Sequence, residues 1–211
     1  MPDSSTFIAF VAASVLIQLI PGPGFLYIFA RSINQGRVAG LLSAVGLVAG
    51  TLVHVFLAMI GLSAVLMASS EAFTLIKLAG ATYLIYLGLK ALISKTSPIK
   101  LSHSEYSTLS RVFIDGIIVS VFNPKVAIFF LAFLPQFVVA EAGSISTQFL
   151  ILGLTFSGLA LLIDGAFALL SDLLRRQLKP SVLSGHVPRV FSGIVFIGLG
   201  IATALMGRRP A

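Results

Sequence analysis

The stretch that decides the fold is residues 4–30, SSTFIAFVAASVLIQLIPGPGFLYIFA, which carries no charged side chain. It is long enough to cross a hydrocarbon core of about 30 Å, because a helix needs roughly 20 apolar residues to do so. Pro21, Gly22, Pro23 and Gly24 lie inside this stretch. A proline within a helix removes one backbone N–H and clashes with the carbonyl group four residues earlier. We therefore expect a membrane-spanning helix that is broken within the bilayer.

The composition of the whole chain agrees with a membrane protein. Of 211 residues, 57% are hydrophobic and 10% are charged, and the mean hydropathy is +1.06. Soluble domains average about 25% charged residues, so a water-soluble globule is excluded. The start of the chain lacks the basic region and small-residue cleavage site of a signal peptide, and we expect it to remain as a mature helix.

Five more apolar segments follow the first, at residues 38–70, 72–93, 112–140, 147–174 and 190–207. The sequence thus predicts an all-α membrane protein with six transmembrane helices. A polar loop divides the chain into a first half at 1–93, a cytoplasmic loop at 94–111 and a second half at 112–211. Three spans per half give the halves opposite orientations, so we expect a 3+3 inverted repeat, as in many secondary transporters.

The lysines and arginines predict the orientation of these helices, because short cytoplasmic loops are enriched in them. Ten of the fourteen fall on one side of the six-helix arrangement: Arg31, Arg37, Lys90, Lys95, Lys100, Arg111, Arg175, Arg176, Lys179 and Arg189. The other side has Lys77, Arg208 and Arg209. We expect the first side to be cytoplasmic and both termini to be external. The terminal pair Arg208 and Arg209 runs against this arrangement, and a five-span protein or a frayed sixth helix would accommodate it better. The net charge of +7 is then a topology signal, and nucleic-acid binding is not expected.

A second break is expected in the fourth helix, where Asn123, Pro124 and Lys125 follow one another. Lys125 lies near the midpoint of this helix, where a lysine costs about 2.5–3.5 kcal/mol on insertion scales. Such residues face the protein interior and usually mark a transport pathway. The alternative is a structural role, as a buried ion pair or a cap on backbone carbonyl groups. We expect the two breaks to meet near the middle of the membrane.

Asp164 is the acidic residue deep in the fifth helix. Gly153, Ser157 and Ala160 precede it at spacings that keep all four residues on one helix face. A stripe of small residues allows helices to approach closely, so Asp164 is expected to point into the bundle. We expect it to share one cavity with Lys125 and to pair with it there.

His54 lies at the midpoint of the second helix, on one face with Gly46 and Gly50. It is a candidate proton relay, because the reference pKa of histidine is near 6.5. The alternative, slightly favoured, is a hydrogen bond between helices.

Several chemistries have no basis in this sequence. It contains no phosphate-binding loop of the Walker type, and three scattered histidines without any cysteine give no metal-binding cluster. No cofactor is expected. An intramembrane enzyme would need a nucleophile or a metal with a base in reach, and a channel would need charge rings or a filter-like loop. Both remain as alternatives to a transporter.

Four groups of residues together resemble the LysE/RhtB family of bacterial amino-acid exporters over nearly the whole chain. They are Pro21-Gly22-Pro23 with Arg31-Ser32 and Gln35-Gly36; the segment 46–61; residues 77–81 with Tyr83-Leu84 and Leu87-Gly88; and Asn123-Pro124-Lys125 with Phe129-Phe130 and residues 133–137. The resemblance implies a six-helix inner-membrane protein that exports amino acids or their derivatives, such as homoserine, threonine or lysine, by proton antiport.

One position departs from the family pattern. The family commonly has an acidic residue directly after the second glycine of the second-helix stripe, where this chain has Thr51. If that acid carries protons in relatives, the coupling of transport to protons in this chain must rely on Asp164 or His54, or must use a different mechanism.

The sequence therefore predicts a secondary exporter of small zwitterionic amino acids, with protons and the lipid bilayer as its other partners. The candidate translocation residues are Pro21, Gly22, Pro23, Gly24, His54, Asn123, Pro124, Lys125 and Asp164. Spaced glycines, Gly80 with Gly88 and Gly193 with Gly200, offer faces on which two copies could form a homodimer.

Overall fold

The computed structural model describes residues 3–62, 70–93, 107–139 and 142–174, together with residues 194, 197, 198 and 201. All secondary structure in these residues is helical. The α-helices are α1 (Ser4–Leu19), α2 (Pro23–Gln35), α3 (Arg37–Leu57), α5 (Ser70–Ile93), α6 (Leu109–Val121), α7 (Pro124–Ile128) and α8 (Ile145–Leu174). Short turns of other helical types extend two of them: η1 (Ala58–Leu62) after α3, and η2 (Phe129–Phe133) and η3 (Leu134–Phe137) after α7.

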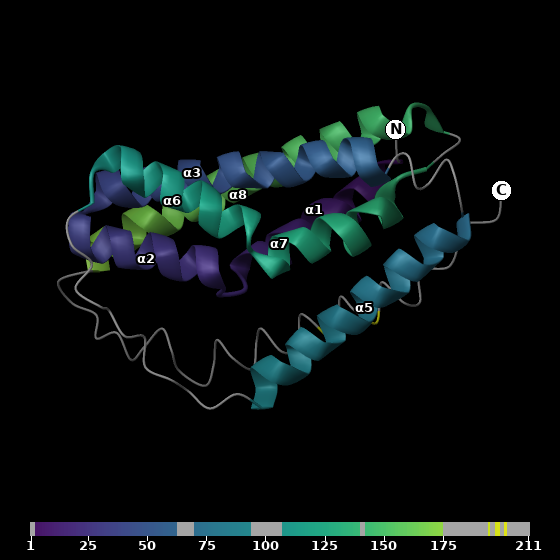
Figure 1. Cartoon of the computed structure of the whole chain (residues 1–211), viewed down its shortest axis with the longest axis horizontal. Coiled ribbons are helices and arrows are strands. Elements are labelled where there is room, and N and C mark those ends of the chain that lie inside the picture. The colour runs from purple at the N-terminus through teal and green to yellow at the C-terminus, as the bar shows by residue number, and fades with distance from the viewer. Residues whose placement is uncertain are drawn as a thin grey trace.

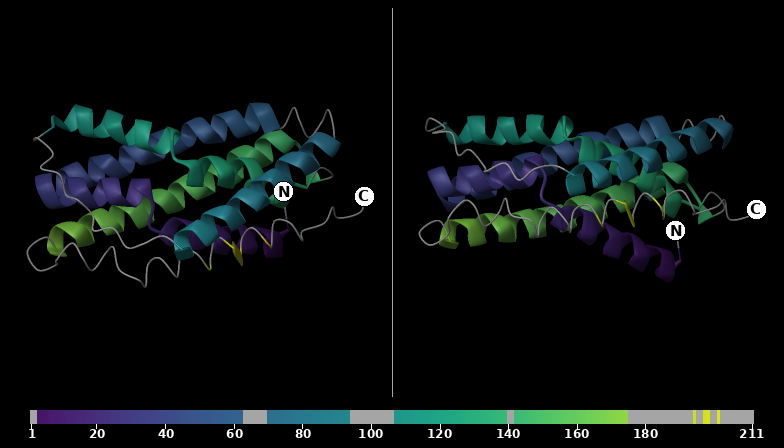
Figure 2. Two further views of the ribbon diagram at one scale, coloured as in Figure 1. Left: turned by 60° about the horizontal axis from the view of Figure 1, so that its bottom comes forward. Right: turned by 90° about the horizontal axis from the view of Figure 1, so that it is seen from below.

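Two long helices, α3 and α8, run the length of the bundle and pack against each other (Figure 1). Beside one half of this pair lie α2 and α6, and beside the other half lie α1 and α7 (Figure 1). Helix α5 packs on η2 and α7 at the side of the bundle (Figure 2). The two bent segments, α1–α2 and α6–α7, therefore both change direction alongside the middle of the α3–α8 pair.

Both predicted breaks are present. The chain leaves α1 at Ile20, whose backbone is extended, and enters α2 at Pro23. The axes of these two helices differ by 55°. Asn123 is also extended and precedes α7, which begins with Pro124 and is bent by 47° from α6. In each case proline stands at the first helical position, where its missing N–H is not needed.

The described helices match most of the predicted spans. Arg37–Gly61 and Ile145–Leu173 are long and apolar enough to cross a membrane, and the bent pairs Ser4–Gln35 and Leu109–Phe137 would each make one further span. Helix α5 corresponds to the third predicted segment at 72–93. The sixth predicted span at 190–207 and the loop at 94–106 lie outside the residues described as continuous segments, so six spans and the inverted repeat are not confirmed.

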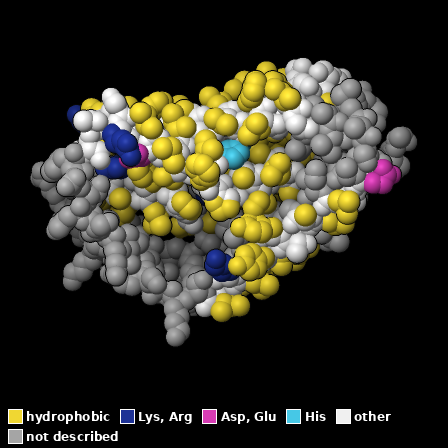
Figure 3. Space-filling view, in the orientation of Figure 1, with side chains coloured by type: hydrophobic (Ala, Val, Ile, Leu, Met, Phe, Trp, Pro, Cys, Tyr) yellow, Lys and Arg dark blue, Asp and Glu magenta, His cyan; other side chains and the backbone are white. Residues whose placement is uncertain are grey.

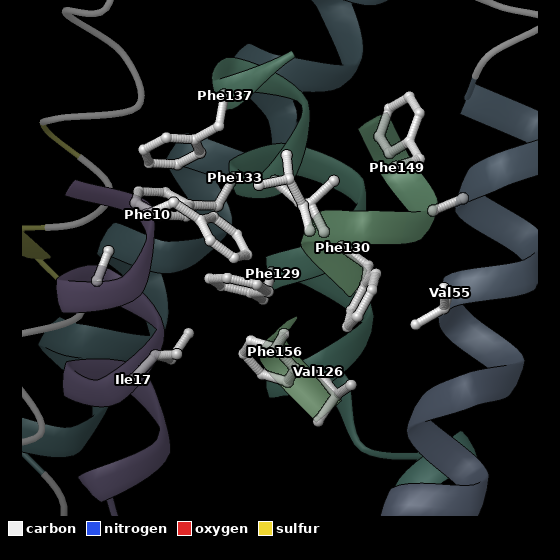
Figure 4. Packing of buried hydrophobic residues seen from close by; sticks show 14 of the residues in the cluster. Phe10, Ile17, Val55, Val126, Phe129, Phe130, Phe133, Phe137, Phe149 and Phe156 are labelled. Carbon is white, nitrogen blue, oxygen red and sulfur yellow. The ribbon is translucent and has the colours of Figure 1, made fainter. Parts of the chain in front are cut away.

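An aromatic core fills the half of the bundle around α1, α7 and the adjoining part of α8. Figure 4 shows Phe10 of α1, Phe156 of α8 and Phe129 of η2 facing one another. The rings of Phe129 and Phe156 stack with centroids 4.4 Å apart. Because lipid tails are as apolar as these side chains, van der Waals packing rather than water exclusion holds such helices together.

Glycines bring α3 and α6 unusually close. A methyl group added at Gly50 would lie 2.6 Å from the carbonyl oxygen of Ile117 and 2.6 Å from Cβ of Ser120. Gly46 and Gly116 face each other one turn further along, with comparable crowding. The small-residue stripe predicted around His54 is therefore a contact face between these two helices, as expected for small residues in membrane bundles.

The described surface of the bundle is largely apolar, with a cluster of charged side chains at one end. Hydrophobic side chains cover much of the face seen in Figure 3. Exposed apolar residues of α3 include Leu41, Leu52 and Phe56. Soluble monomers rarely expose apolar patches of this extent, so this surface suits a lipid environment. Lysine and arginine side chains gather where α2 ends and α6 begins (Figure 3).

Candidate functional site

The two helix breaks lie against each other. A Cβ built on Gly22 would sit 3.6 Å from Nζ of Lys125, and one on Gly24 would sit 3.9 Å from Nδ2 of Asn123. The first break therefore faces the second, and the lack of a side chain at Gly22 and Gly24 allows the two breaks to approach closely. This is the meeting of breaks that the prolines and glycines predicted.

Lys125 binds the open end of α1. Its Nζ donates a hydrogen bond of 2.9 Å to the carbonyl oxygen of Ile20 and one of 3.2 Å to that of Ile17. Because α1 ends there, these carbonyl groups lack the usual helical donor four residues on, although that of Ile17 also accepts a hydrogen bond of 3.3 Å from the N–H of Ile20. Lys125 therefore has the role given above as the alternative: it caps backbone carbonyl groups.

Asn123 caps the start of α7, where its Oδ1 accepts a hydrogen bond of 3.0 Å from the backbone N–H of Lys125. The start of α2 has no such side-chain cap. In the first described hydrogen bond of this helix, the N–H of Leu26 donates to the carbonyl oxygen of Gly22 over 3.0 Å. The N–H groups of Gly24 and Phe25 precede this bond, and such first-turn groups suit a carboxylate.

Both breaks open on a cavity of about 50 Å³. Its polar wall consists of Gln18, Thr51, Ser120, Asn123, Lys125 and Asp164, with Gly24 beside them. Its apolar wall consists of Ile17, Phe25, Leu47, Val126, Phe129, Phe156 and Ala160. A volume of this size has room for a few water molecules. Small-molecule pockets typically measure several hundred Å³, so a bound amino acid would require the surrounding helices or side chains to move.

Asp164 reaches the cavity from α8, on the face that it shares with Ala160. Ser157 and Ala160 on this face are buried, which agrees with the inward orientation predicted from the small-residue stripe. The predicted pairing with Lys125 is wrong in its direct form, because no ion pair within 4.0 Å joins the two side chains. Lys125 is held instead by the α1 carbonyl groups, and Asp164 faces the same cavity without a hydrogen-bond partner among the described residues.

His54 does not line this cavity. Its Nε2 lies 3.3 Å from the carbonyl oxygen of Ser120, and its ring stacks on Phe130 with centroids 6.0 Å apart. This is the hydrogen bond between helices that the sequence slightly favoured, joining α3 to α6.

Three polar cavity residues were not among the predicted site residues. Gln18 donates from Nε2 to the carbonyl oxygen of Phe156 over 3.1 Å, while its buried Oε1 has no partner among the described residues. Thr51 and Ser120 lie on facing helices with their hydroxyl oxygens 3.1 Å apart. Gln18 carries a usable sequence signal, since it is a lone amide one turn before the Pro21 break; Ser120 carries none.

A second polar cluster joins α2 to α6 at the charged end. Arg31 pairs with Asp115 over 3.3 Å, and Arg111 pairs with the same carboxylate over 2.9 Å. Arg111 and Asp115 are four residues apart on α6, a spacing that favours such a pair, whereas Arg31 comes from another helix. Arg31 also donates hydrogen bonds to Gln35 and Ser107, so this cluster fixes the position of the end of α2.

Comparison with known proteins agrees with these features. The family model described as LysE type translocator matches residues 15–207. A leucine efflux protein of Enterobacter sp. (strain 638) is 28% identical over 199 residues, covering 94% of each chain. A homoserine/homoserine lactone efflux protein of Salmonella typhimurium (strain LT2) is 28% identical over 197 residues, covering 93% of this chain and 95% of its own.

An uncharacterized membrane protein of Bacillus subtilis (strain 168), YrhP, is 28% identical over 209 residues, covering 95% of this chain and 99% of its own. No solved structure matches the chain significantly. The family and the two efflux proteins are described as translocators and efflux proteins, not as enzymes. A family model that matches nearly the whole chain, on a bundle whose proline breaks enclose a charged cavity, shows that this protein is a member of the LysE type translocator family.

Proposed function

We propose that the protein exports amino acids from the cytoplasm across the bacterial inner membrane, as a secondary transporter driven by proton antiport. The observation that carries this proposal is the cavity where both helix breaks meet Lys125 and Asp164. Discontinuous helices around a charged site at mid-membrane are a recurrent design of secondary transporters. Relatives described as leucine and homoserine efflux proteins support an amino acid as the substrate.

The two charges of the cavity match the two charges of an amino acid. The substrate carboxylate would bind Lys125, supported by the first-turn N–H groups of Gly24 and Phe25 and the partial positive charge at the start of α2. The substrate ammonium would bind Asp164. Because Lys125 already donates to Ile17 and Ile20, its third N–H bond is the one available without breaking the α1 cap.

Asp164 is the proposed proton carrier. Protonation from the external side would remove its negative charge and weaken its hold on the ammonium group, so that the substrate is released outward. The empty carrier would then return with the proton and lose it to the cytoplasm. Thr51 offers no titratable group in the cavity, and His54 lies outside it, which leaves Asp164 as the acidic group best placed for this step.

The orientation follows from the charged residues. We propose that the end of the bundle with Arg31, Arg37 and Arg111 faces the cytoplasm and that both termini are external. The 3+3 inverted repeat belongs to this proposal. Its support is that each bent segment has proline at the start of its second helix, and that the two segments cross the bundle in opposite directions (Figure 1).

Transport into inverted membrane vesicles tests the proposal. Vesicles that contain the protein should accumulate labelled leucine or homoserine when their lumen is acidic, and much less without the pH gradient. Vesicles without the protein are the control. Accumulation that needs the protein but ignores the gradient would retain amino-acid transport and reject proton antiport. A substrate-independent ion current would favour a channel instead.

A further inference from the structure

We propose that Gln18 is a substrate-binding residue, and that its Oε1 accepts a hydrogen bond from the ammonium group of the transported amino acid. The inference rests on the proposed export of amino acids and adds a second ligand for the ammonium group beside Asp164. Its basis is one buried atom. Of the buried side-chain nitrogen and oxygen atoms that lack a hydrogen bond in the described part of the chain, Oε1 of Gln18 is the one whose residue lines the cavity.

The other end of the Gln18 amide fixes its orientation. Nε2 donates a hydrogen bond of 3.1 Å to the carbonyl oxygen of Phe156, which joins α1 to α8. Exchanging the amide nitrogen and oxygen would set two acceptor oxygens against each other, because a carbonyl oxygen cannot donate. Oε1 is therefore the atom without a partner. Since an amide oxygen only accepts hydrogen bonds, its partner in the cavity must be a donor, which excludes the substrate carboxylate.

Helix α8 places the Gln18 amide and Asp164 on either side of Ala160. Phe156, Ala160 and Asp164 follow one another at intervals of four residues, and all three line the cavity. Phe156 and Asp164 are about 12 Å apart along the helix axis, from eight residues at a rise of about 1.5 Å each. The Phe156 carbonyl oxygen and the Asp164 carboxylate are closer than that, because a helical carbonyl points toward the C-terminus and a helical side chain leans toward the N-terminus. The small side chain of Ala160 leaves room between them.

An ammonium group has three N–H donors. Each of them needs an acceptor when the group leaves water, because a buried donor without a partner weakens binding. The carboxylate of Asp164 can accept one or two of these bonds. The other side-chain oxygens of the polar wall already have partners: Oδ1 of Asn123 accepts a backbone N–H, and the hydroxyl oxygens of Thr51 and Ser120 lie 3.1 Å apart. Gln18 supplies an acceptor that no described residue uses.

Gln18 and Asp164 have different tasks in the proposed transport cycle. The amide of Gln18 stays neutral in every step, whereas Asp164 gains and loses the transported proton. Gln18 therefore keeps one hydrogen bond to the ammonium group while the hold of Asp164 changes. It contributes to the affinity for the substrate and takes no part in proton coupling.

Counterflow in proteoliposomes of defined lipid composition tests the contact without requiring a proton gradient. The protein amino acids and homoserine, labelled and offered one at a time to the purified full-length protein, first identify the substrates. Gln18→Met then removes the amide but keeps the length of the side chain. We expect the KM to rise by about tenfold or more, as for the loss of a hydrogen bond to a charged group. A rise of less than about threefold would overturn the inference and leave amino-acid transport intact, whereas no exchange of any amino acid would reject both.

Gln136→Met is the matched control. The Gln136 amide has the same pattern of contacts, since Nε2 donates to the carbonyl oxygen of Ala132 over 2.7 Å and the buried Oε1 has no partner among the described residues. Gln136 does not line the cavity, so its replacement should leave the KM unchanged. An equal rise in both methionine variants would trace the effect to altered packing and contradict a contact between Gln18 and the substrate.

Gln18→Glu separates the two ends of the amide. It retains an acceptor oxygen for the ammonium group, but as a carboxylate it cannot donate to Phe156. We expect its KM to equal that of the natural protein or to fall below it. A rise that matches Gln18→Met would show that the bond to Phe156 is the whole role of Gln18. Should Gln18→Met not insert into the membrane, Gln18→Glu decides by the same criterion.

Amino acids with an apolar side chain assign the contact to the ammonium group, because at neutral pH they have no other N–H or O–H donor. The loss of affinity in Gln18→Met should therefore appear with leucine or alanine, tested as substrates or as competitors of the best labelled substrate, as well as with homoserine. A loss confined to homoserine, or to other amino acids with a donor in the side chain, would place Gln18 against the substrate side chain and overturn the assignment.

Discussion

Nζ of Lys125 lies 2.9 Å from the carbonyl oxygen of Ile20, so the helix break in the second half of the chain binds the broken end of the first helix. This contact couples the proposed substrate site to the position of α1. A substrate carboxylate that competes for Lys125 would weaken the bond to Ile20 and loosen α1 from α7. Binding and helix movement would then share one ammonium group.

Replacing Lys125 by alanine should weaken substrate binding. The loss of a charge-assisted hydrogen bond of about 1.5–3 kcal/mol corresponds to a rise in KM of about tenfold or more. Counterflow kinetics would measure it, with Lys90→Ala, on the exposed face of α5, as the control. If Lys125→Ala lowers thermal stability but leaves KM unchanged, the lysine is only a cap for α1.

Replacing Asp164 by asparagine should uncouple export from protons, because the amide cannot take up a proton in the transport cycle. Transport driven by a pH gradient should vanish, while slow exchange of labelled for unlabelled substrate persists. Asp172→Asn, two turns later on α8, should leave coupling intact. Normal gradient-driven transport in Asp164→Asn would show that Asp164 is structural and would make His54 the next candidate proton carrier.

Opposite effects are expected from two glycine-to-alanine substitutions. Gly50→Ala places a methyl group 2.6 Å from the Ile117 carbonyl oxygen, and such overpacking costs about 1–3 kcal/mol. Gly158→Ala on α8 meets no described atom within 4 Å and should stabilise the helix by about 0.5–1 kcal/mol. Thermal unfolding in detergent would compare them. Equal effects of the two substitutions would contradict the close α3–α6 contact.

Removing the charge of Asp115 should destabilise the protein more than removing that of Arg111. Asp115→Asn leaves Arg31, which is 8% exposed, without its counter-charge, at a cost of about 1–3 kcal/mol. The Arg111 side chain is 68% exposed, so Arg111→Ala should cost about 0–1 kcal/mol, as is usual for surface pairs. Unfolding temperatures measured side by side would rank the two variants. The reverse order would show that Arg31 does not depend on Asp115.

Single-cysteine labelling tests the orientation, since the natural chain has no cysteine. Ser144→Cys, exposed just before α8, should react with a membrane-impermeant reagent in intact cells. Ser102→Cys, in the predicted cytoplasmic loop, should react only after the cells are opened. Labelling of Ser102→Cys in intact cells would reverse the orientation derived from the lysines and arginines.

The sequence by itself determined the features that depend on local chemistry. Apolar runs long enough for a bilayer predicted the spans that α3, α8 and the two bent pairs provide. Prolines predicted the breaks at Pro23 and Pro124, because the ring removes a hydrogen bond wherever the helix lies. The stripe before Asp164 predicted its inward direction, since helical periodicity fixes which residues share a face.

Only the tertiary structure decided which groups meet. Lys125 and Asp164 reach one cavity, but the carbonyl groups at the end of α1, which no pattern in the sequence ties to α7, hold the lysine. Gln18, Ser120 and Arg31 acquired their partners from helices about 70 or more residues away in the chain. Periodicity gives the direction in which a side chain leaves its own helix, whereas packing distance and helix rotation determine what it touches, and these depend on every helix at once.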